Sequence, residues 1–147
     1  MKNRLVFPLL NKIIILLFFL NFYSCNFISK DYYQKEIELI ENLDGVSISN
    51  KTEKIFILTE HNCLPCNKLF SEFMTNNIEN PNFLFIINAT GNVIDISTFK
   101  NAKSSKIVIK KLEEEFFKDT KLIKLKNKEI DTIIKISSEN IFDVIKS

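Results

Sequence analysis

Two cysteines separated by two residues, Cys63 and Cys66, are the side chains of this 147-residue sequence best suited to chemistry. Thiols at this spacing can close a small disulfide, and such a pair can carry redox chemistry. The motif Cys63-Leu64-Pro65-Cys66 follows a short β-branched and aromatic run at 54–58, and apolar residues at helical spacing come after it. The sequence therefore places the two cysteines at a strand-to-helix turn.

The start of a helix favours the ionised form of the first cysteine. Unpaired backbone N–H groups and the helix dipole stabilise a thiolate there, which lowers the thiol pKa. Pro65 suits the first turn, because its missing N–H costs nothing and its φ is already helical. Cys63 is therefore expected to be the exposed nucleophile. Cys66, on the apolar stripe with Leu69 and Phe70, is expected to be the resolving thiol.

Two residues just before the cysteines are candidates for supporting roles. His61, the only histidine, can raise the thiolate fraction when protonated, or it is simply a polar loop residue. Glu60 is a candidate proton acceptor. Together with both thiols, His61 gives at most three metal ligands. The main expectation is no metal and no cofactor, with a copper or zinc site at His61, Cys63 and Cys66 as the alternative.

The first 24 residues have the pattern of an export signal. Positive charge from Lys2, Arg4 and Lys12 precedes an apolar run at 13–20, and a serine stands directly before Cys25. This junction resembles the lipobox of bacterial lipoproteins. It implies that Cys25 carries a lipid that anchors the protein to a membrane of the bacterial cell envelope, facing the periplasm. An uncleaved anchor helix is the alternative, and both interpretations export the rest of the chain.

The length of the chain after the export signal fits one domain, and its charge limits the possible partners. Residues 25–32 are predicted to be a tether and residues 33–147 a single domain. The chain carries a formal net charge of +2, of which residues 1–24 contribute +3, so the rest carries −1. That balance gives no support to nucleic-acid binding. The scattered lysines are expected on solvated faces, and neither a phosphate-binding glycine loop nor a hydrolytic triad is present in the sequence.

Apolar spacing predicts the elements of the first half of the domain. A helix is expected over 33–43, ended at Gly45, and a short strand over 46–49. The runs 54–58 and 83–87 are typical of buried strands. Because a helix connects these two strands, they are predicted to pair in parallel through a right-handed crossover.

The second half is predicted to hold two helical segments, a hairpin and a last helix. We expect helix within 93–106 and again over 106–118, where Ile109, Leu112 and Phe116 keep helical spacing. Strands at 122–125 and 130–136 form a hairpin, whose turn residue Asn127 can adopt a positive φ, and Ser138 caps the last helix. The inner face of the second strand is expected to hold Ile130, Thr132, Ile134 and Ile136.

The motif around the cysteines matches the C-G-P-C motif of the thioredoxin-like family in three of four positions. The chain is similar to this family over about residues 33–146, and its turn at 126–129, Lys-Asn-Lys-Glu, resembles the family's K-N-G-E turn before a closing helix. The resemblance implies an α/β, thioredoxin-like three-layer fold with a central mixed sheet and helices on both faces. It also implies a thiol-disulfide oxidoreductase, which exchanges disulfides with exported protein thiols or disulfides, or with a membrane electron donor.

Three positions depart from the family pattern. Thr120 stands where the family has a cis-proline before the hairpin, Asn62 replaces the aromatic residue before the first cysteine, and Ile57 replaces a buried acid. The family's cis-proline lies opposite the thiols and helps to receive the substrate chain. Thr120 therefore leaves an alternative open, a non-catalytic thioredoxin-like binding module in which Cys63 and Cys66 form a structural disulfide.

Overall fold

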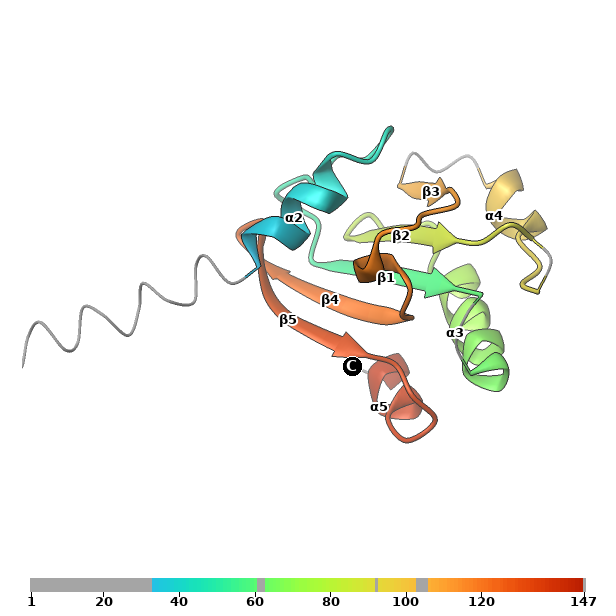
Figure 1. Cartoon of the computed structure of the whole chain (residues 1–147). Coiled ribbons are helices and arrows are strands. Elements are labelled where there is room, and N and C mark those ends of the chain that lie inside the picture. The colour runs from blue at the N-terminus through green and yellow to red at the C-terminus, as the bar shows by residue number, and fades with distance from the viewer. Residues whose placement is uncertain (1–32, 61–62, 92, 103–105, 147) are drawn as a thin grey trace, which may run out of the picture. The chain divides into compact units, whose positions relative to one another are not determined.

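Five strands form one mixed sheet in the order β3-β2-β1-β4-β5 (Figure 1). The computed structural model describes residues 33–60, 63–91, 93–102 and 106–146, and the sheet lies in the second of two compact units, Glu36–Ser147. β1 pairs in parallel with β2 and β2 with β3, whereas β4 is antiparallel to β1 and β5 to β4. The strands are β1 (Lys54–Thr59), β2 (Phe83–Asn88), β3 (Ile107–Ile109), β4 (Lys121–Lys126) and β5 (Glu129–Lys135).

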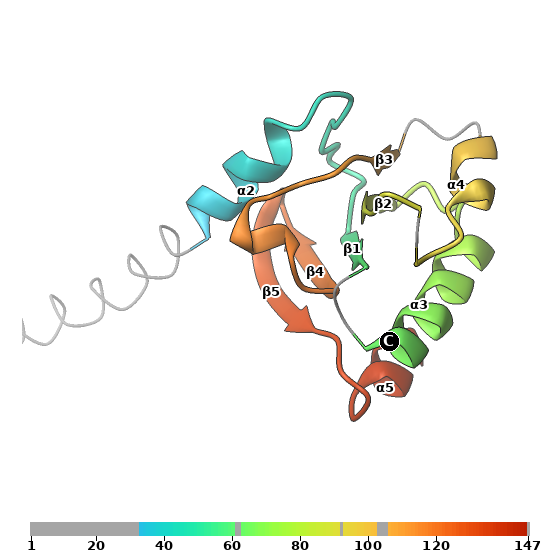
Figure 2. The same ribbon diagram turned by 45° about the vertical axis from the view of Figure 1, so that its right-hand side comes forward.

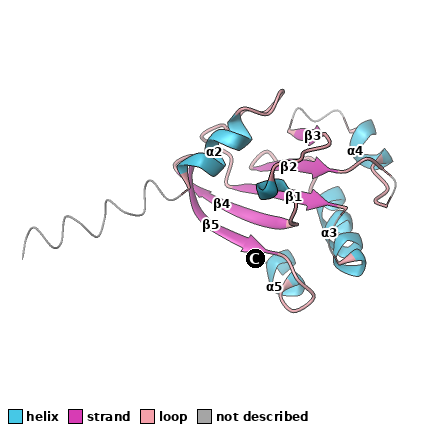
Figure 3. Cartoon of the chain, in the orientation of Figure 1, coloured by secondary structure: helices cyan, strands magenta, loops and turns pink. Residues whose placement is uncertain are grey.

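Helices lie on both faces of the sheet, so the predicted α/β class with a mixed sheet is confirmed (Figures 2 and 3). One face carries the α3-side core, in which Phe70, Ile141 and Phe99 from three helices pack against the sheet. The opposite face carries the α2-side core, to which Ile40 and Phe117 contribute. The helices are α2 (Gln34–Glu41), α3 (Leu64–Asn76), α4 (Ser97–Asn101), α5 (Ile141–Lys146) and the 3-10 helix η1 (Glu115–Phe117).

The central strands β1 and β2 are buried on both faces, as their continuous apolar sequences predict. Successive side chains point to opposite faces, so Ile55 belongs to the α2-side core and Phe56 to the α3-side core. The Phe56 ring lies 5.7 Å from that of Phe70 and 5.5 Å from that of Phe85, measured between centroids. These contacts fix α3, and with it the cysteine motif, on the sheet.

The predicted strand at 46–49 is wrong. The helix α2 ends as expected and Gly45 has a φ of 84°, but the following segment is a loop that buries Ile48. Its backbone turns back at Ser49, whose carbonyl accepts a hydrogen bond from the Thr52 N–H. β3 pairs with the edge of β2 that β1 does not use, so this edge is not open to another parallel strand.

The predicted helix at 106–118 is also wrong, whereas the helical segment within 93–106 is confirmed by α4. Three β-branched residues form β3 in its place, paired with β2. After β3 the buried Asn88 side chain holds the backbone out of a helix. Its amide donates to the carbonyls of Leu112 and Phe117, and its oxygen accepts from the Leu112 N–H, at 2.8–3.0 Å.

The hairpin forms as predicted, with a β-bulge that changes its inner face. Asn127 has the expected positive φ of 54°, and Lys128 has a φ of 67°, as in a two-residue type I′ turn. Lys124 pairs with Thr132 and Leu125 with Ile130, which leaves one extra residue between them. The bulge turns Ile130 to the α2-side core, while Ile134 and Ile136 pack in the α3-side core, so the prediction that all share one face is wrong.

Two further expectations about polar residues are wrong. The helix α5 begins at Ile141, and the turn before it is held by the Asn140 side chain, not capped by Ser138. Lys121 is buried although lysines were expected on solvated faces. Its amine donates to the Phe116 carbonyl and lies 4.3 Å from the Phe116 ring centroid, and burial lowers the pKa of Lys121.

Candidate redox site

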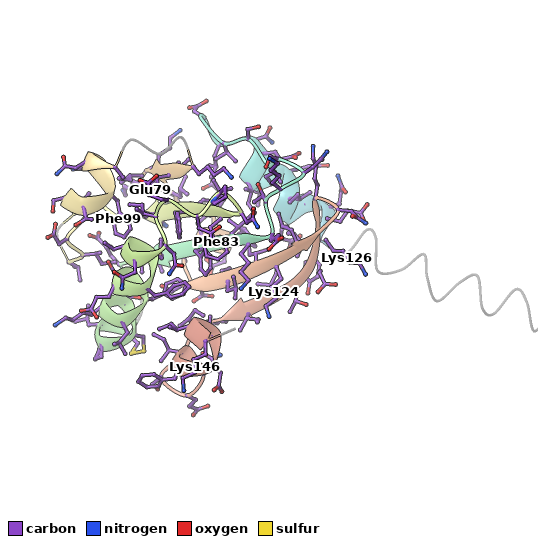
Figure 4. All side chains as sticks on the ribbon, turned by 180° about the vertical axis from the view of Figure 1, so that it is seen from behind. Glu79, Phe83, Phe99, Lys124, Lys126 and Lys146 are labelled. Atoms are coloured by element: carbon purple, nitrogen blue, oxygen red, sulfur yellow. A yellow bond between two sulfur atoms is a disulfide. The ribbon has the colours of Figure 1, made fainter. Side chains whose placement is uncertain are left out.

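Cys63 and Cys66 form a disulfide at the first turn of α3 (Figure 4). Their Cα atoms are 5.2 Å apart, and Cys63 is the N-cap residue of the helix. The Cys63 sulfur accepts a hydrogen bond from the Cys66 N–H at 3.4 Å. Pro65 lies in the first turn, where it was predicted. The structure therefore places one sulfur against the backbone N–H groups of a helix start.

The two cysteines differ in exposure, as the helical spacing predicted. Cys63 is exposed, whereas Cys66 is 4% exposed and packs in the α3-side core with Phe70 and Met74. This difference follows from the turn of the helix. The N-cap residue faces solvent, and the residue three positions later begins the buried stripe. Cys63 is therefore the cysteine exposed to solvent, and Cys66 is shielded from it.

A buried polar network lies next to the disulfide and joins three elements of the fold. The Asn67 side chain donates to the Thr59 carbonyl at the end of β1 at 2.7 Å. The Thr120 hydroxyl donates to the Asn67 side-chain oxygen at 3.0 Å and accepts from the Thr59 N–H at 3.2 Å. All three residues are at least 95% buried. The network ties the first turn of α3 to the segment before β4.

The network gives Thr120 a defined place, and it contains a residue that sequence reasoning missed. Thr120 lies directly before β4, and its hydroxyl is hydrogen-bonded to Asn67, the residue after Cys66. Asn67 shares the buried face of α3 with Phe70 and Met74, three and seven positions later, so helical spacing could have indicated its burial. Its burial results from partners on β1 and before β4, and no local pattern in the sequence signals them.

The Glu60 carboxylate, just after β1, holds Thr90, Gly91 and Val93 through hydrogen bonds. One oxygen accepts from the backbone N–H and the hydroxyl of Thr90, and the other from the N–H groups of Gly91 and Val93, at 2.9–3.2 Å. Burial acts to raise the pKa of Glu60, but the hydrogen bonds outweigh it and lower the pKa to about 2. So acidic a carboxyl is a weak proton acceptor at neutral pH, and its observed contacts are structural.

Other predicted site residues lie outside the described residues. These are His61, whose supporting or metal-binding role stays a prediction, and Cys25 with the export signal and the tether. Within the described ranges, no group of three or more histidine, cysteine, aspartate or glutamate side chains is arranged to hold a metal ion. None of the helices in those ranges is both long and apolar enough to span a membrane.

The comparisons with known proteins found no match to this chain. The chain matches no protein-family model, no curated protein and no solved structure. A functional conclusion therefore depends on the geometry of the disulfide and its surroundings. That geometry shows a C-x-x-C disulfide, of a redox or structural kind, between one exposed and one buried cysteine.

Proposed function

We propose that this protein is a thiol-disulfide oxidoreductase of the thioredoxin-like family, acting through Cys63 and Cys66. The observation that carries the proposal is the disulfide at the start of α3, with Cys63 exposed at the N-cap and Cys66 buried. The mixed sheet, the helices on both of its faces and the closing hairpin and helix support the thioredoxin-like arrangement. The Cys-Leu-Pro-Cys motif supports it as well.

The exchange needs only the two cysteines and a partner disulfide. In the reduced protein, the Cys63 thiolate attacks one sulfur of the partner, forms a mixed disulfide and releases the other partner sulfur as a thiolate. The Cys66 thiol then loses its proton to solvent and attacks the Cys63 sulfur. The Cys63–Cys66 disulfide forms, and the partner leaves with two more electrons and takes up two protons from solvent to become a dithiol. The reverse sequence oxidises a partner dithiol.

The exposures of the two sulfurs assign the attacking and resolving roles. Only the exposed Cys63 can accept a protein partner without unfolding the start of α3. Cys66 needs no access from solvent, because its target sulfur already lies beside it in the motif. The helix start stabilises negative charge on Cys63 when the bond opens, which favours this cysteine as both attacking and leaving group.

Trapping of the mixed disulfide tests the proposal. Cys66→Ala keeps the attacking thiol and removes the resolving one, so this variant is expected to accumulate an adduct with its natural partner. Cys63→Ala is the matched control and is expected to trap far less. Non-reducing gels followed by mass identification of the adduct provide the measurement. Equal trapping by the two variants would contradict the assigned roles.

A structural disulfide is the second candidate function, and Thr120 is the observation that favours it. In the thioredoxin-like family a cis-proline occupies the place before the hairpin, whereas Thr120 uses its hydroxyl in the buried network. The protein would then be a binding module stabilised by its Cys63–Cys66 bond. Absence of any adduct from both cysteine variants, together with an ordinary thiol reactivity, would favour this candidate.

We also propose that the protein acts in the bacterial cell envelope, attached to a membrane through a lipid on Cys25 and facing the periplasm. The pattern of residues 1–25 supports this location, and it would bring Cys63 to exported proteins or to a membrane electron donor. Metabolic labelling with a fatty acid tests the anchor. Cys25→Ala should lose the label while Cys63→Ala keeps it. Equal label on Cys25→Ala and the wild type would leave the uncleaved anchor helix in its place.

A further inference from the structure

A groove of about 760 Å³ runs along α3 from the residue that follows Cys63. One wall is formed by α3, and the other by residues 93–95 and by Thr98 of α4. The lining residues used below are Leu64, Lys68, Ser71, Glu72, Val93 and Asp95. The groove therefore shares its first lining residue, Leu64, with the Cys-Leu-Pro-Cys motif.

The groove has exposed apolar side chains in a setting that is otherwise mostly polar. In the described part of the chain, only three large apolar residues are strongly exposed, namely Leu64, Val93 and Phe142. Two of the three, Leu64 at 60% and Val93 at 54%, line this groove. Exposed apolar side chains that share one concave surface are typical of a binding site.

The Glu60 carboxylate fixes the groove wall relative to the redox pair. The Glu60 carboxylate accepts a hydrogen bond from the Val93 N–H. Glu60 directly follows β1 and stands three residues before Cys63. The wall that carries Val93 is thereby tied to the strand that leads into the cysteine motif. This arrangement holds an apolar contact at a defined place beside the reactive disulfide.

We propose that this groove binds an extended segment of the partner polypeptide next to the cysteine that reacts with Cys63. The inference rests on the proposed function. A mixed disulfide with Cys63 brings the partner chain to Leu64, where the groove begins, so the groove continues the site of exchange. Along α3 the lining residues extend from Leu64 to Asn76, about 18 Å of helix, which an extended segment of about five residues matches.

The lining residues define the chemistry of the segment that fits. An apolar side chain beside the partner cysteine can cover Leu64 and Val93. Lys68, Glu72 and Asp95 line the groove as well and carry charges of both signs, so the rest of the segment is expected to be polar with little net charge. The substrate class is therefore an unfolded or flexible exported polypeptide with an apolar residue next to its cysteine.

Exchange rates with synthetic disulfides test the inference. Three probes are used with the reduced full-length protein: a short peptide whose cysteine, flanked by leucines, carries 2-thiopyridine; the same peptide with serines as flanks; and the mixed disulfide of cysteamine and 2-thiopyridine. Attack by Cys63 on the peptide sulfur releases 2-thiopyridone, and Cys66 then releases the peptide thiol. The leucine peptide is expected to react about fivefold faster than the serine peptide, and the cysteamine probe reports exchange without a groove contact.

Matched variants test whether the groove causes the preference for the leucine peptide. Val93→Ser removes an apolar lining residue, and Phe142→Ser removes an equally exposed one elsewhere. Ser71→Arg fills the groove, and Asn101→Arg places the same side chain on the neighbouring α4 outside the lining set. The two groove variants are expected to lose the preference for leucine, and the two control variants to keep it. The two control variants should react with the cysteamine probe at the wild-type rate.

The outcomes separate the groove from the redox function. Retention of the leucine preference by Val93→Ser and Ser71→Arg, or absence of any preference in the wild type, would overturn the groove while leaving exchange intact. Loss of the leucine preference by Phe142→Ser as well would show that the preference is not specific to the groove, and it would overturn the inference. A wild-type rate with the cysteamine probe no faster than that of free cysteine would overturn the proposed function, and the groove's role with it.

Discussion

The buried network beside the disulfide predicts a large stability loss for Asn67→Ala. The Asn67 side chain donates to the Thr59 carbonyl and accepts from the Thr120 hydroxyl, and both partners are buried. Removing one partner of a buried hydrogen bond costs about 1–3 kcal/mol, because the group left behind has lost water as well. Alanine is the better helix former by about 0.5 kcal/mol, which offsets a part of this cost. Because Asn67→Ala leaves two such groups, the Thr59 carbonyl and the Thr120 hydroxyl, the cost lies near the upper end of that range, and the net expected loss is about 2–2.5 kcal/mol.

Urea denaturation of the purified oxidised protein measures this loss, with Asn77→Ala as the matched control. Asn77, at the other end of α3, donates one side-chain hydrogen bond to the Phe73 carbonyl at 2.8 Å and is only half-buried. Its replacement is expected to cost about 0.5–1 kcal/mol. A denaturation midpoint that shifts without a change in slope shows that stability, not the denatured state, has changed.

A double-mutant cycle with Thr120→Val assigns the loss to the network. This variant keeps the shape of Thr120 and removes the hydroxyl that contacts both Asn67 and Thr59. Because the two substitutions remove a shared hydrogen bond, the double variant should lose less than the sum of the single losses by about 1 kcal/mol. Strict additivity, or a loss for Asn67→Ala no larger than for Asn77→Ala, would refute the reasoning.

Two other side chains give predictions on pH and on the hairpin turn. Glu60→Gln should destabilise the protein by about 1–2 kcal/mol at neutral pH, because it removes the charged acceptor of the Thr90 and Val93 N–H groups. The pKa of Glu60 falls from its usual 4.5 to about 2 on folding, so its stabilising contribution is full above pH 4.5 and is lost as pH falls toward 2. Denaturation at several pH values should therefore show a shallower acid loss for Glu60→Gln than for the wild type, and equal slopes would contradict this role. Lys128→Gly should stabilise the protein by about 1 kcal/mol in thermal denaturation, because Lys128 has a φ of 67°. Lys126→Gly, within β4, is the control and should destabilise; stabilisation by both would argue against the turn geometry.

The parts of the fold that could be predicted from sequence are those with a strong local pattern. The apolar runs of β1 and β2 and the apolar stripe of α3 set these elements, and the short connections between them favour the observed parallel pairing. The pattern failed over 107–117, where helical spacing was present. There the pairing of β3 with β2 and three hydrogen bonds of the Asn88 side chain determine the backbone.

The candidate site was predictable in its two cysteines and not in the residues around them. Spacing alone placed Cys63 at the exposed helix start and Cys66 on the buried stripe. Asn67 is held by Thr120, 53 positions away, and Glu60 by Thr90, 30 positions away. Contacts over such separations depend on how the sheet brings distant segments together, and a single sequence carries no periodic signal for them.

The reactivity of Cys63 in the reduced protein tests the redox proposal most directly. Alkylation by iodoacetamide is followed against pH, with mass spectrometry to identify the cysteine that reacts. A thiolate stabilised at the start of α3 predicts that Cys63 reacts first and that its rate rises with a midpoint well below about 8.5, the value of a free cysteine. A midpoint at or above that value, or equal reaction of Cys66, would contradict thiol-disulfide exchange through Cys63.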